Sequence, residues 1–366
     1  MTAVPSLRDK LQARIREAGP ITFRDWMDAA LYDSQHGYYR APDRSPWGRE
    51  GDYRTSPERT TLFAATLARY VLELYRELGE PSAWTIFEPG AGSGDFALQV
   101  VETLQDLDAR SFKRCRYIID ERSEASRSKI SERLGPFSER VQFCSIEAVE
   151  AFDGIVFANE LLDAFPVHRV TTRDDKLLEY FVNVDETGAF HWQLGTVSNA
   201  EVHEYFRRIE IKPREGQIIE VNPAIEHWLK LLGAKLSRGF LILIDYGAES
   251  EELLQSPLRN SGTLRAIRRH QFIQDVFANP GKQDLTTTIN WTYVRSVAAD
   301  FGFAVREFLG QDKFLLKIGL LEELERRLRR ASNEAEKMRI TTEAREMILP
   351  TGMAAGFQVL VLTKNQ

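Results

Sequence analysis

The chain has 366 residues, of which 43% are hydrophobic and 28% are charged. These values are typical of a folded globular protein, built as one large domain with insertions or as two smaller domains. The net charge of −6, from 48 basic and 54 acidic residues, argues against a protein that coats nucleic acid. No run of 18 apolar residues is present, so we expect no membrane insertion.

Only two cysteines occur, Cys115 and Cys144, both in apolar, strand-like stretches. Two such cysteines predict no disulfide framework, and no histidine has a partner at metal-ligand spacing, so we assign no metal site. The N-terminus is charged and has no apolar segment of the kind found in secretory signals. The sequence therefore predicts a cytoplasmic protein.

The first 80 residues predict helices and one long loop. Apolar residues recur at helical spacing over 6–18, 22–32 and 59–78, and Thr22 is a candidate cap of the second helix. The stretch before the third helix is rich in Gly, Pro, Asp and Ser, which predicts a loop of the length that is often functional. We treat 1–80 as N-terminal helices and this loop.

From residue 84 onward, short apolar strands alternate with helices. Strands are expected at WTIFE, CRYIIDE, VQFCS, GIVFANE and GFLILIDYG, with a last strand at FQVLVLTK. This alternation is typical of βαβ units around a mostly parallel sheet with helices on both faces. The fold class is therefore α/β, with residues 81–366 as the core.

Two insertions and one charged stretch depart from this alternation. Residues 173–215 include LEYFVNVDETGAFHWQL, which predicts a β-hairpin inserted in the sheet. The polar segment 248–290 is expected to serve substrate or partner binding. Residues 321–349 predict a charged amphipathic helix with a solvated face.

The stretch WTIFEPGAGSGDFA at 84–97 predicts a ligand-binding turn. Gly90, Gly92 and Gly94 stand between an expected strand and an expected helix, where glycines allow a tight turn and let a ligand touch the main chain. A dinucleotide-binding turn would need glycine at position 95, where Asp95 would also repel a pyrophosphate. No Gly-Lys-Ser/Thr follows, so the turn is not a P-loop either.

Nearby carboxylates favour S-adenosylmethionine, a cofactor without phosphate, as the ligand. Glu88 stands two residues before the first glycine and is expected to support the loop or the α-amino group of the cofactor. Asp120 and Glu121 end the next strand, where a carboxylate can accept hydrogen bonds from both ribose hydroxyls. The alternative is a strand–helix turn with a purely structural role.

Four polar residues follow or end buried strands and are the candidate catalytic residues. They are Asn159, Glu160 and Asp163, after GIVFA, and Asp245, in LILIDYG. Ligands of open α/β sheets bind at the carboxyl ends of the strands, and polar groups there are unfavourable unless they bind or cap something. Such carboxylates can hold a positively charged group of a substrate and take up a proton that this group releases. Helix capping by Asn159 and a turn-forming role for Asp245 remain alternatives.

Eight stretches together resemble one known family. They are GPITFRDWMDAALYDSQHGYY (19–39), GDYRTSPE (51–58), FEPGAGSGDFA (87–97), ANELLDAFPV (158–167), LILIDYG (241–247), GTLRAIRRHQ (262–271), DLT (284–286) and PTGMAAGFQVLVL (350–362). In this order they are similar to the MidA-like S-adenosylmethionine-dependent methyltransferases, which are related to the mitochondrial complex I assembly methyltransferase. The resemblance implies a Rossmann-like class I methyltransferase core with family insertions, and methyl transfer to arginine of a protein by analogy with the mitochondrial relative.

The resemblance also widens the set of candidate site residues. It favours a segment that covers the cofactor at 51–58, although capping of a helix by Thr55 or Ser56 is an alternative. The basic residues Arg265, Arg268 and His270 are expected on the substrate or partner side. The added cofactor-binding candidates are Gly51, Asp52, Tyr53, Thr55, Ser56, Pro57, Glu58, Ser145, Ile146, Asn159 and Glu160.

The sequence thus predicts an S-adenosylmethionine-dependent methyltransferase, with S-adenosylhomocysteine as product and a protein arginine as acceptor. The family often has E-x-S-P where this chain has Glu220–Pro223, and the chain shows no obvious transit peptide, so the acceptor of the mitochondrial relative does not transfer safely with the resemblance. Alternatives are another protein side chain or a small molecule as acceptor, and a cofactor-binding assembly factor with little catalysis. A nicotinamide dehydrogenase is disfavoured by Asp95. We expect no nucleic-acid partner, and a homodimer is left open.

Overall fold

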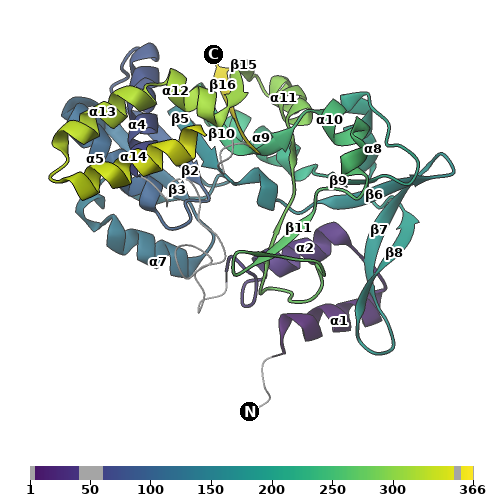
Figure 1. Cartoon of the computed structure of the whole chain (residues 1–366). Helices are drawn as coiled ribbons and strands as arrows, with labels where there is room; N and C mark the ends of the chain where they lie inside the picture. Colours follow the sequence, from purple (N-terminus) through teal and green to yellow (C-terminus); the bar gives the residue numbers. More distant parts are fainter. Residues whose placement is uncertain (1–4, 41–60, 350–355, 366) are drawn as a thin grey trace.

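The computed structural model of the chain describes residues 5–40, 61–349 and 356–365 (Figure 1). The segment predicted to cover the cofactor lies outside these ranges, so the roles of its residues stay predictions. These residues are Gly51, Asp52, Tyr53, Thr55, Ser56, Pro57 and Glu58.

The centre of the molecule is an eight-stranded sheet with the order β15-β16-β10-β5-β2-β3-β4, with β14 paired to β10. The ladders that join β4, β3, β2, β5 and β10 are parallel, whereas β16 runs antiparallel to both of its neighbours. The predicted mostly parallel sheet is confirmed. Its strands are β2 (Trp84–Pro89), β3 (Cys115–Asp120), β4 (Val141–Phe143), β5 (Phe152–Asn159), β10 (Leu236–Ala248), β14 (Ile289–Asn290), β15 (Ala304–Gly310) and β16 (Phe357–Lys364).

Helices cover both faces of this sheet, and successive residues of a strand pack into different cores. In β5, Ile155 and Phe157 belong to the core with α4 and α5, whereas Val156 and Ala158 belong to the core with α9 and α11. A strand buried on both faces reads as a continuous apolar run, which is why GIVFA and LILI predicted strands. The helices around the sheet are α4 (Thr61–Glu77), α5 (Asp95–Leu107), α6 (Ala109–Arg114), α7 (Glu124–Arg133), α8 (Ala200–Ile209), α9 (Ala224–Lys235), α10 (Ser250–Gln255), α11 (Trp291–Asp300) and α12 (Gln311–Lys317).

The predicted β-hairpin forms, but its predicted place in the central sheet is wrong. Its two strands, β7 and β8, pair within a separate five-stranded sheet, where β7 also pairs with β1 and β6. Because both edges of β7 are paired there, the hairpin has no free edge of β7 to offer the central sheet. The strands are β1 (Ile21–Thr22), β6 (His168–Arg173), β7 (Lys176–Val184), β8 (Phe190–Thr196) and β9 (Ile218–Val221).

The first two helices belong to a third core, next to this second sheet. Helices α1 (Leu7–Ala18) and α2 (Phe23–Tyr32) pack there with Val182, Phe190 and Leu285. The Thr22 hydroxyl caps α2 by accepting a hydrogen bond from the backbone N–H of Asp25 at 3.1 Å, as predicted. In Figure 1, α1 and α2 lie beside β7 and β8, far from α4 and α5. The domain limits predicted at 80/81 stay a prediction; because α4 packs against α5, we propose that α4 belongs to the methyltransferase core.

The segment 248–290 adds a small three-stranded sheet of β11 (Arg265–Arg268), β12 (Gln271–Ile273) and β13 (Asp284–Thr286). Leu285 and Ala266 bury this sheet against α2 in the third core. None of the helices in the described ranges has both the length and the apolar character needed to cross a membrane.

The prediction of one solvated helix over 321–349 is wrong, because this stretch forms parts of two helices. Helix α13 spans Leu320–Arg330, and α14 spans Glu334–Ile348. The Asn333 side chain caps the start of α14 by accepting a hydrogen bond from the N–H of Glu336 at 2.9 Å. The predicted solvated face also holds a fully buried carboxylate, Glu323 of α13.

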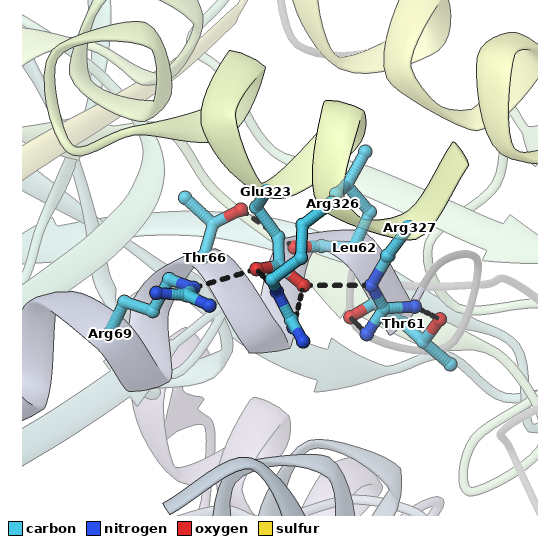
Figure 2. Close-up of polar contacts among 7 residues, drawn as sticks. All are labelled: Thr61, Leu62, Thr66, Arg69, Glu323, Arg326 and Arg327. Atoms are coloured by element: carbon cyan, nitrogen blue, oxygen red, sulfur yellow. Dashed lines mark hydrogen bonds and ion pairs between the residues drawn. The ribbon is translucent and has the colours of Figure 1, made fainter. Parts of the chain in front are cut away.

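Glu323 joins α13 to α4 through three arginines (Figure 2). Its oxygens accept from Nε of Arg69 at 2.7 Å, Nε of Arg326 at 2.9 Å and Nε of Arg327 at 3.0 Å, and Arg327 also donates to the carbonyl of Thr61 at 3.1 Å. Burial alone would raise the pKa of Glu323, but these hydrogen bonds outweigh it and lower the pKa. A charged carboxylate can be buried here because it is surrounded by cations.

Candidate active site

A cavity of about 310 Å³ lies between the carboxyl edge of the central sheet, α2 and α9. This is the position at which open α/β sheets bind their ligands. The sheet edge contributes Pro89, Gly90, Asp120, Glu121, Ile146, Glu160 and Leu161. The opposite walls are formed by Arg24, Asp28, Tyr32 and Tyr39 around α2 and by Ala224, His227, Trp228 and Leu231 of α9.

The glycine turn has the conformation that its sequence requires. Gly90, Gly92 and Gly94 have φ of +70°, +57° and +76°, which L side chains rarely adopt. A Cβ on Gly90 would also lie 3.0 Å from Leu161 Cδ1, and one on Gly94 would lie 3.0 Å from Ile130. Gly90 lies in the cavity wall, while Gly92 and Gly94 shape the turn into α5.

The predicted ribose acceptors, Asp120 and Glu121, both line the cavity. Asp120 Oδ2 accepts from the N–H of Ile146 at 2.9 Å, and Glu121 Oε1 accepts from the N–H of Ser123 at 2.7 Å, so backbone groups hold both side chains in place. Burial raises the pKa of Asp120 and raises that of Glu121 to about 7. Of the other two candidates on this side, Ile146 lines the cavity, and the carbonyl of Ser145 accepts from Val149 at 2.9 Å.

Glu88 lies behind the glycine turn and is buried. Its Oε2 accepts from the Tyr117 hydroxyl at 2.7 Å. Burial raises the pKa of Glu88 to about 8, although the hydrogen bond from Tyr117 opposes this rise. Glu88 is therefore joined to β3 through Tyr117, and both support of the glycine turn and contact with the cofactor amino group stay predictions.

Glu160 combines a strained backbone with a place in the cavity wall. Its φ of +50° is in the left-handed region, which costs a non-glycine residue on the order of 1–3 kcal/mol. The conformation is held by a hydrogen bond from its N–H to the Ile244 carbonyl at 2.9 Å and by one from Asn159 Nδ2 to Glu160 Oε1 at 2.9 Å. Strain of this kind is retained when the surroundings fix it, and it concentrates at functional sites.

Asp163 and Asp245 are buried and bonded to the turn that follows Glu160. Asp245 Oδ2 accepts from the N–H groups of Leu162 at 2.9 Å and Asp163 at 3.2 Å, and its Oδ1 accepts from the N–H of Tyr246 at 2.8 Å. Asp163 Oδ2 accepts from the Thr286 hydroxyl at 2.6 Å. Burial raises the pKa of Asp163, and burial together with the charge of Asp163 raises the pKa of Asp245 well above its usual value. These contacts match the turn-forming alternative, and a direct catalytic role stays a prediction.

The three basic candidates lie on β11 and on the turn that follows it, outside the cavity wall. The Arg265 guanidinium lies over the Tyr246 ring, 5.5 Å from its centroid. Arg268 donates from Nη1 to Asn279 Oδ1 at 3.2 Å. His270 is exposed and has a φ of +62°. The structure therefore does not bring these residues together at the cavity.

Sequence reasoning missed the cavity residues that come from helices. Arg24 and Asp28 stand four residues apart on α2, and Tyr32 of the same helix donates to the Ala164 carbonyl at 2.9 Å. A face of polar residues on a helix with a buried core face was the available signal for this pair. Trp228 of α9 gave no signal of its own, because its spacing is that of a core residue.

A family profile and several curated proteins match this chain. The profile of the family described as "Putative S-adenosyl-L-methionine-dependent methyltransferase" matches residues 66–309. The mitochondrial "Protein arginine methyltransferase NDUFAF7 homolog" of Drosophila melanogaster is 26% identical, over 81% of this chain and 71% of that protein. The protein of the same name from Caenorhabditis elegans is 24% identical, over 94% of this chain and 83% of that protein.

Two crystal structures from Burkholderia thailandensis have the same fold. One was solved with bound S-adenosyl-homocysteine. It is 28% identical with a TM-score of 0.86, and the alignment covers 98% of this chain and 92% of that chain. The other is a native structure that is 29% identical with a TM-score of 0.84, and the alignment covers 98% of this chain and 91% of that chain.

The residues around the cavity fit an S-adenosyl ligand. The volume is within the range of small-molecule sites, roughly 300–1,000 Å³. The main chain at Gly90 carries no side chain that would block close approach, and Asp120 and Glu121 supply acceptors for hydroxyl groups. Asn159 Oδ1 is a buried acceptor without a partner, so a donor on a ligand would satisfy it.

Proposed function

This chain belongs to the family of S-adenosyl-L-methionine-dependent methyltransferases, and we propose that its methyl acceptor is an arginine side chain of a protein. Relatives that match most of the chain carry the name protein arginine methyltransferase. An arginine acceptor is a cation at neutral pH, and Glu160 supplies a carboxylate at the sheet edge of the cavity besides the predicted ribose acceptors.

The observation that carries the proposal is that Glu160, a residue with a strained backbone, lies in the cavity wall. S-adenosylmethionine supplies a methyl group that is already activated on its sulfonium. What the protein must add is position and the exclusion of water. Glu160 holds the acceptor guanidinium by charge-assisted hydrogen bonds, turns one nitrogen toward the methyl group and accepts the proton that this nitrogen loses.

The other three catalytic candidates act on Glu160 in this proposal. Asn159 fixes the carboxylate through its bond to Oε1. Asp245 accepts two hydrogen bonds from the turn at Leu162–Ala164, which follows Glu160, and Asp163 of this turn accepts one from Thr286. They are therefore positioning residues rather than groups that touch the acceptor.

The test is methylation of a lysate from a strain that lacks this gene, with labelled S-adenosylmethionine and the pure protein. We expect a labelled protein band that releases methylarginine on hydrolysis. The variant Glu160→Gln should lose methyl transfer by roughly 100-fold or more, because a group that accepts a proton contributes at least that much. Its affinity for S-adenosylhomocysteine, measured by calorimetry, should change only a few-fold. Glu150→Gln, an exposed site, serves as the matched control.

Other outcomes would identify the alternatives. Label on a different side chain, or only in the small-molecule fraction, would replace the arginine acceptor. A Glu160→Gln protein that complements a deletion strain as well as the wild type would favour an assembly factor that binds the cofactor with little catalysis. A cytoplasmic location and a homodimer stay predictions from the sequence, and the named relatives are mitochondrial.

A further inference from the structure

Arg265 carries two buried N–H groups that have no partner. Both Nε and Nη2 are inaccessible to solvent and make no hydrogen bond. Among the arginines of the described residues, Arg208 and Arg238 also have an unpartnered buried Nε, but each of these is in an ion pair. Among the described residues, Arg265 is the one arginine that has two such nitrogens and forms no ion pair with a carboxylate.

The two nitrogens lie on the same edge of the guanidinium. Nε–H and the adjacent Nη2–H are parallel donors with the spacing of two carboxylate oxygens, so this edge binds a carboxylate with two hydrogen bonds. Leaving a buried donor unsatisfied costs about 1–3 kcal/mol, and more for a charged group. A vacant edge of this kind is therefore the signature of a ligand.

Arg265 lies next to the turn that carries Glu160. It pairs in β11 with Thr286 of β13, and the hydroxyl of Thr286 donates to Asp163. Its guanidinium lies over the Tyr246 ring. Burial is the main cause that raises the pKa of Tyr246; the charges of Glu160, Asp163 and Asp245 raise it further, whereas that of Arg265 lowers it. One cation and three acids thus act on the same tyrosine.

This arrangement selects a carboxylate that arrives together with a cation. A lone carboxylate at Arg265 would be repelled by Glu160 and Asp163. A carboxylate beside a positive charge would meet Arg265 with its anion and Glu160 with its cation.

We propose that the Nε–Nη2 edge of Arg265 binds a carboxylate, supplied either by the amino-acid end of the S-adenosyl cofactor or by an acidic side chain beside an arginine in the acceptor. The second source rests on the proposed function. The first does not, because the ammonium of the cofactor is then the accompanying cation.

The first arm of the test measures cofactor binding by calorimetry for the wild type, Arg265→Gln, Arg265→Lys and Arg238→Gln. The ligands are S-adenosylhomocysteine and methylthioadenosine, which lacks the amino-acid end. If the cofactor supplies the carboxylate, Arg265→Gln weakens S-adenosylhomocysteine about 10- to 100-fold, the size of a charge-assisted pair, and leaves methylthioadenosine unchanged. Arg238, which is paired with Asp153, is the control.

The second arm measures peptide binding to the protein saturated with S-adenosylhomocysteine. Short peptides with glutamate directly before or after arginine are compared with matched glutamine peptides. If the acceptor supplies the carboxylate, the wild type prefers the glutamate peptides about tenfold or more, and Arg265→Gln loses that preference while cofactor affinity is unchanged.

Each outcome decides the proposal. A difference in either arm that Arg265→Lys does not rescue supports a two-bond carboxylate site. Full rescue by lysine would leave only a counter-charge for Asp163, and equal behaviour of the wild type and Arg265→Gln in both arms would also overturn the site. Neither arm depends on methylation, so a failure to find methylarginine in the lysate would count against the proposed function alone.

Discussion

Two buried glutamates, one below the glycine turn and one on α13, have opposite pKa shifts. Glu323 lies among three arginines, and its pKa is lowered. Among the described residues, the Tyr117 hydroxyl is the hydrogen-bond partner of the Glu88 carboxyl, and burial raises the pKa of Glu88 to about 8. Both residues are almost inaccessible to solvent, and the three arginines around Glu323 explain why its pKa is lowered while that of Glu88 is raised.

The difference separates a structural region from a functional one. In the Glu323 cluster, three arginines pair with the carboxylate and fix α13 on α4. The carboxyl edge of the central sheet contains several acids whose pKa is raised, Glu88, Asp120, Glu121 and Asp245, so its protonation can respond to a ligand. Such perturbed acids in a cleft are typical of active sites.

The largest effect is expected where the charged cluster is broken. Glu323→Gln leaves three arginines without their shared counter-charge and should lower the free energy of unfolding by about 3 kcal/mol, because removal of one partner of a buried ion pair is strongly destabilising. Urea unfolding at neutral pH measures it. Glu325→Gln on the same helix breaks an exposed pair with Arg329 and should change the free energy by less than about 0.5 kcal/mol. Similar losses for the two variants would mean that burial adds nothing at Glu323.

The second prediction concerns Glu88→Gln, which should stabilise the protein at high pH, whereas Glu323→Gln destabilises it. The folded-state pKa of Glu88 is above its unfolded value, so the folded state holds a proton that the unfolded state releases, and the wild type loses stability as pH rises from about 4.5 to about 8. Glu88→Gln removes this loss. It should match the wild type near pH 4 and exceed it above pH 8 by a few kcal/mol, because each pKa unit of the shift corresponds to about 1.4 kcal/mol.

Thermal or urea unfolding across pH 4–9 checks this. Tyr117→Phe is the companion variant, since loss of its hydrogen bond should raise the pKa of Glu88 further. A constant difference between Glu88→Gln and the wild type at all pH values would show that Glu88 does not titrate in this range.

The smallest expected effect concerns ligand affinity. Glu121, with a pKa of about 7, must lose its proton to accept hydrogen bonds from ribose hydroxyls. The wild-type affinity for S-adenosylhomocysteine should therefore fall by up to about tenfold per pH unit below pH 7, the limit for one linked proton. Calorimetry from pH 5.5 to 8 measures the slope. Glu121→Gln should bind weakly and without this slope, and a wild-type slope that survives in the variant would assign the proton to another group.

The sequence predicts those parts of this molecule that are set by local pattern. The apolar runs of β5 and β10, the cap at Thr22 and the glycine turn all follow from spacing within a few residues. Strand ends also identify Gly90, Asp120, Glu121 and Glu160, because carboxyl ends of parallel strands share one edge. All four line the cavity.

The sequence does not show which elements far apart in the chain pack against each other. A strand pattern does not say which strand edge the hairpin pairs with, so the predicted sheet is the wrong one, and β1, which pairs with β7, is only two residues long. The opposite cavity wall, with Asp28 and Trp228, comes from helices that meet the sheet only in the folded molecule. The burial of Glu323 likewise depends on Arg69, 254 residues away.

The cavity lies between α2, which packs in the third core, and α9, which packs in one of the two cores of the central sheet. A molecule that fills it contacts two units that otherwise fold around separate interiors. Ligand binding therefore stabilises the packing of these two units against each other, by about 2.7 kcal/mol when the free ligand concentration is a hundred times the dissociation constant. Amide hydrogen exchange in α1 and α2 should become slower when the protein is saturated with ligand. Exchange in α1 would then depend on ligand binding although α1 contributes no residue to the cavity wall.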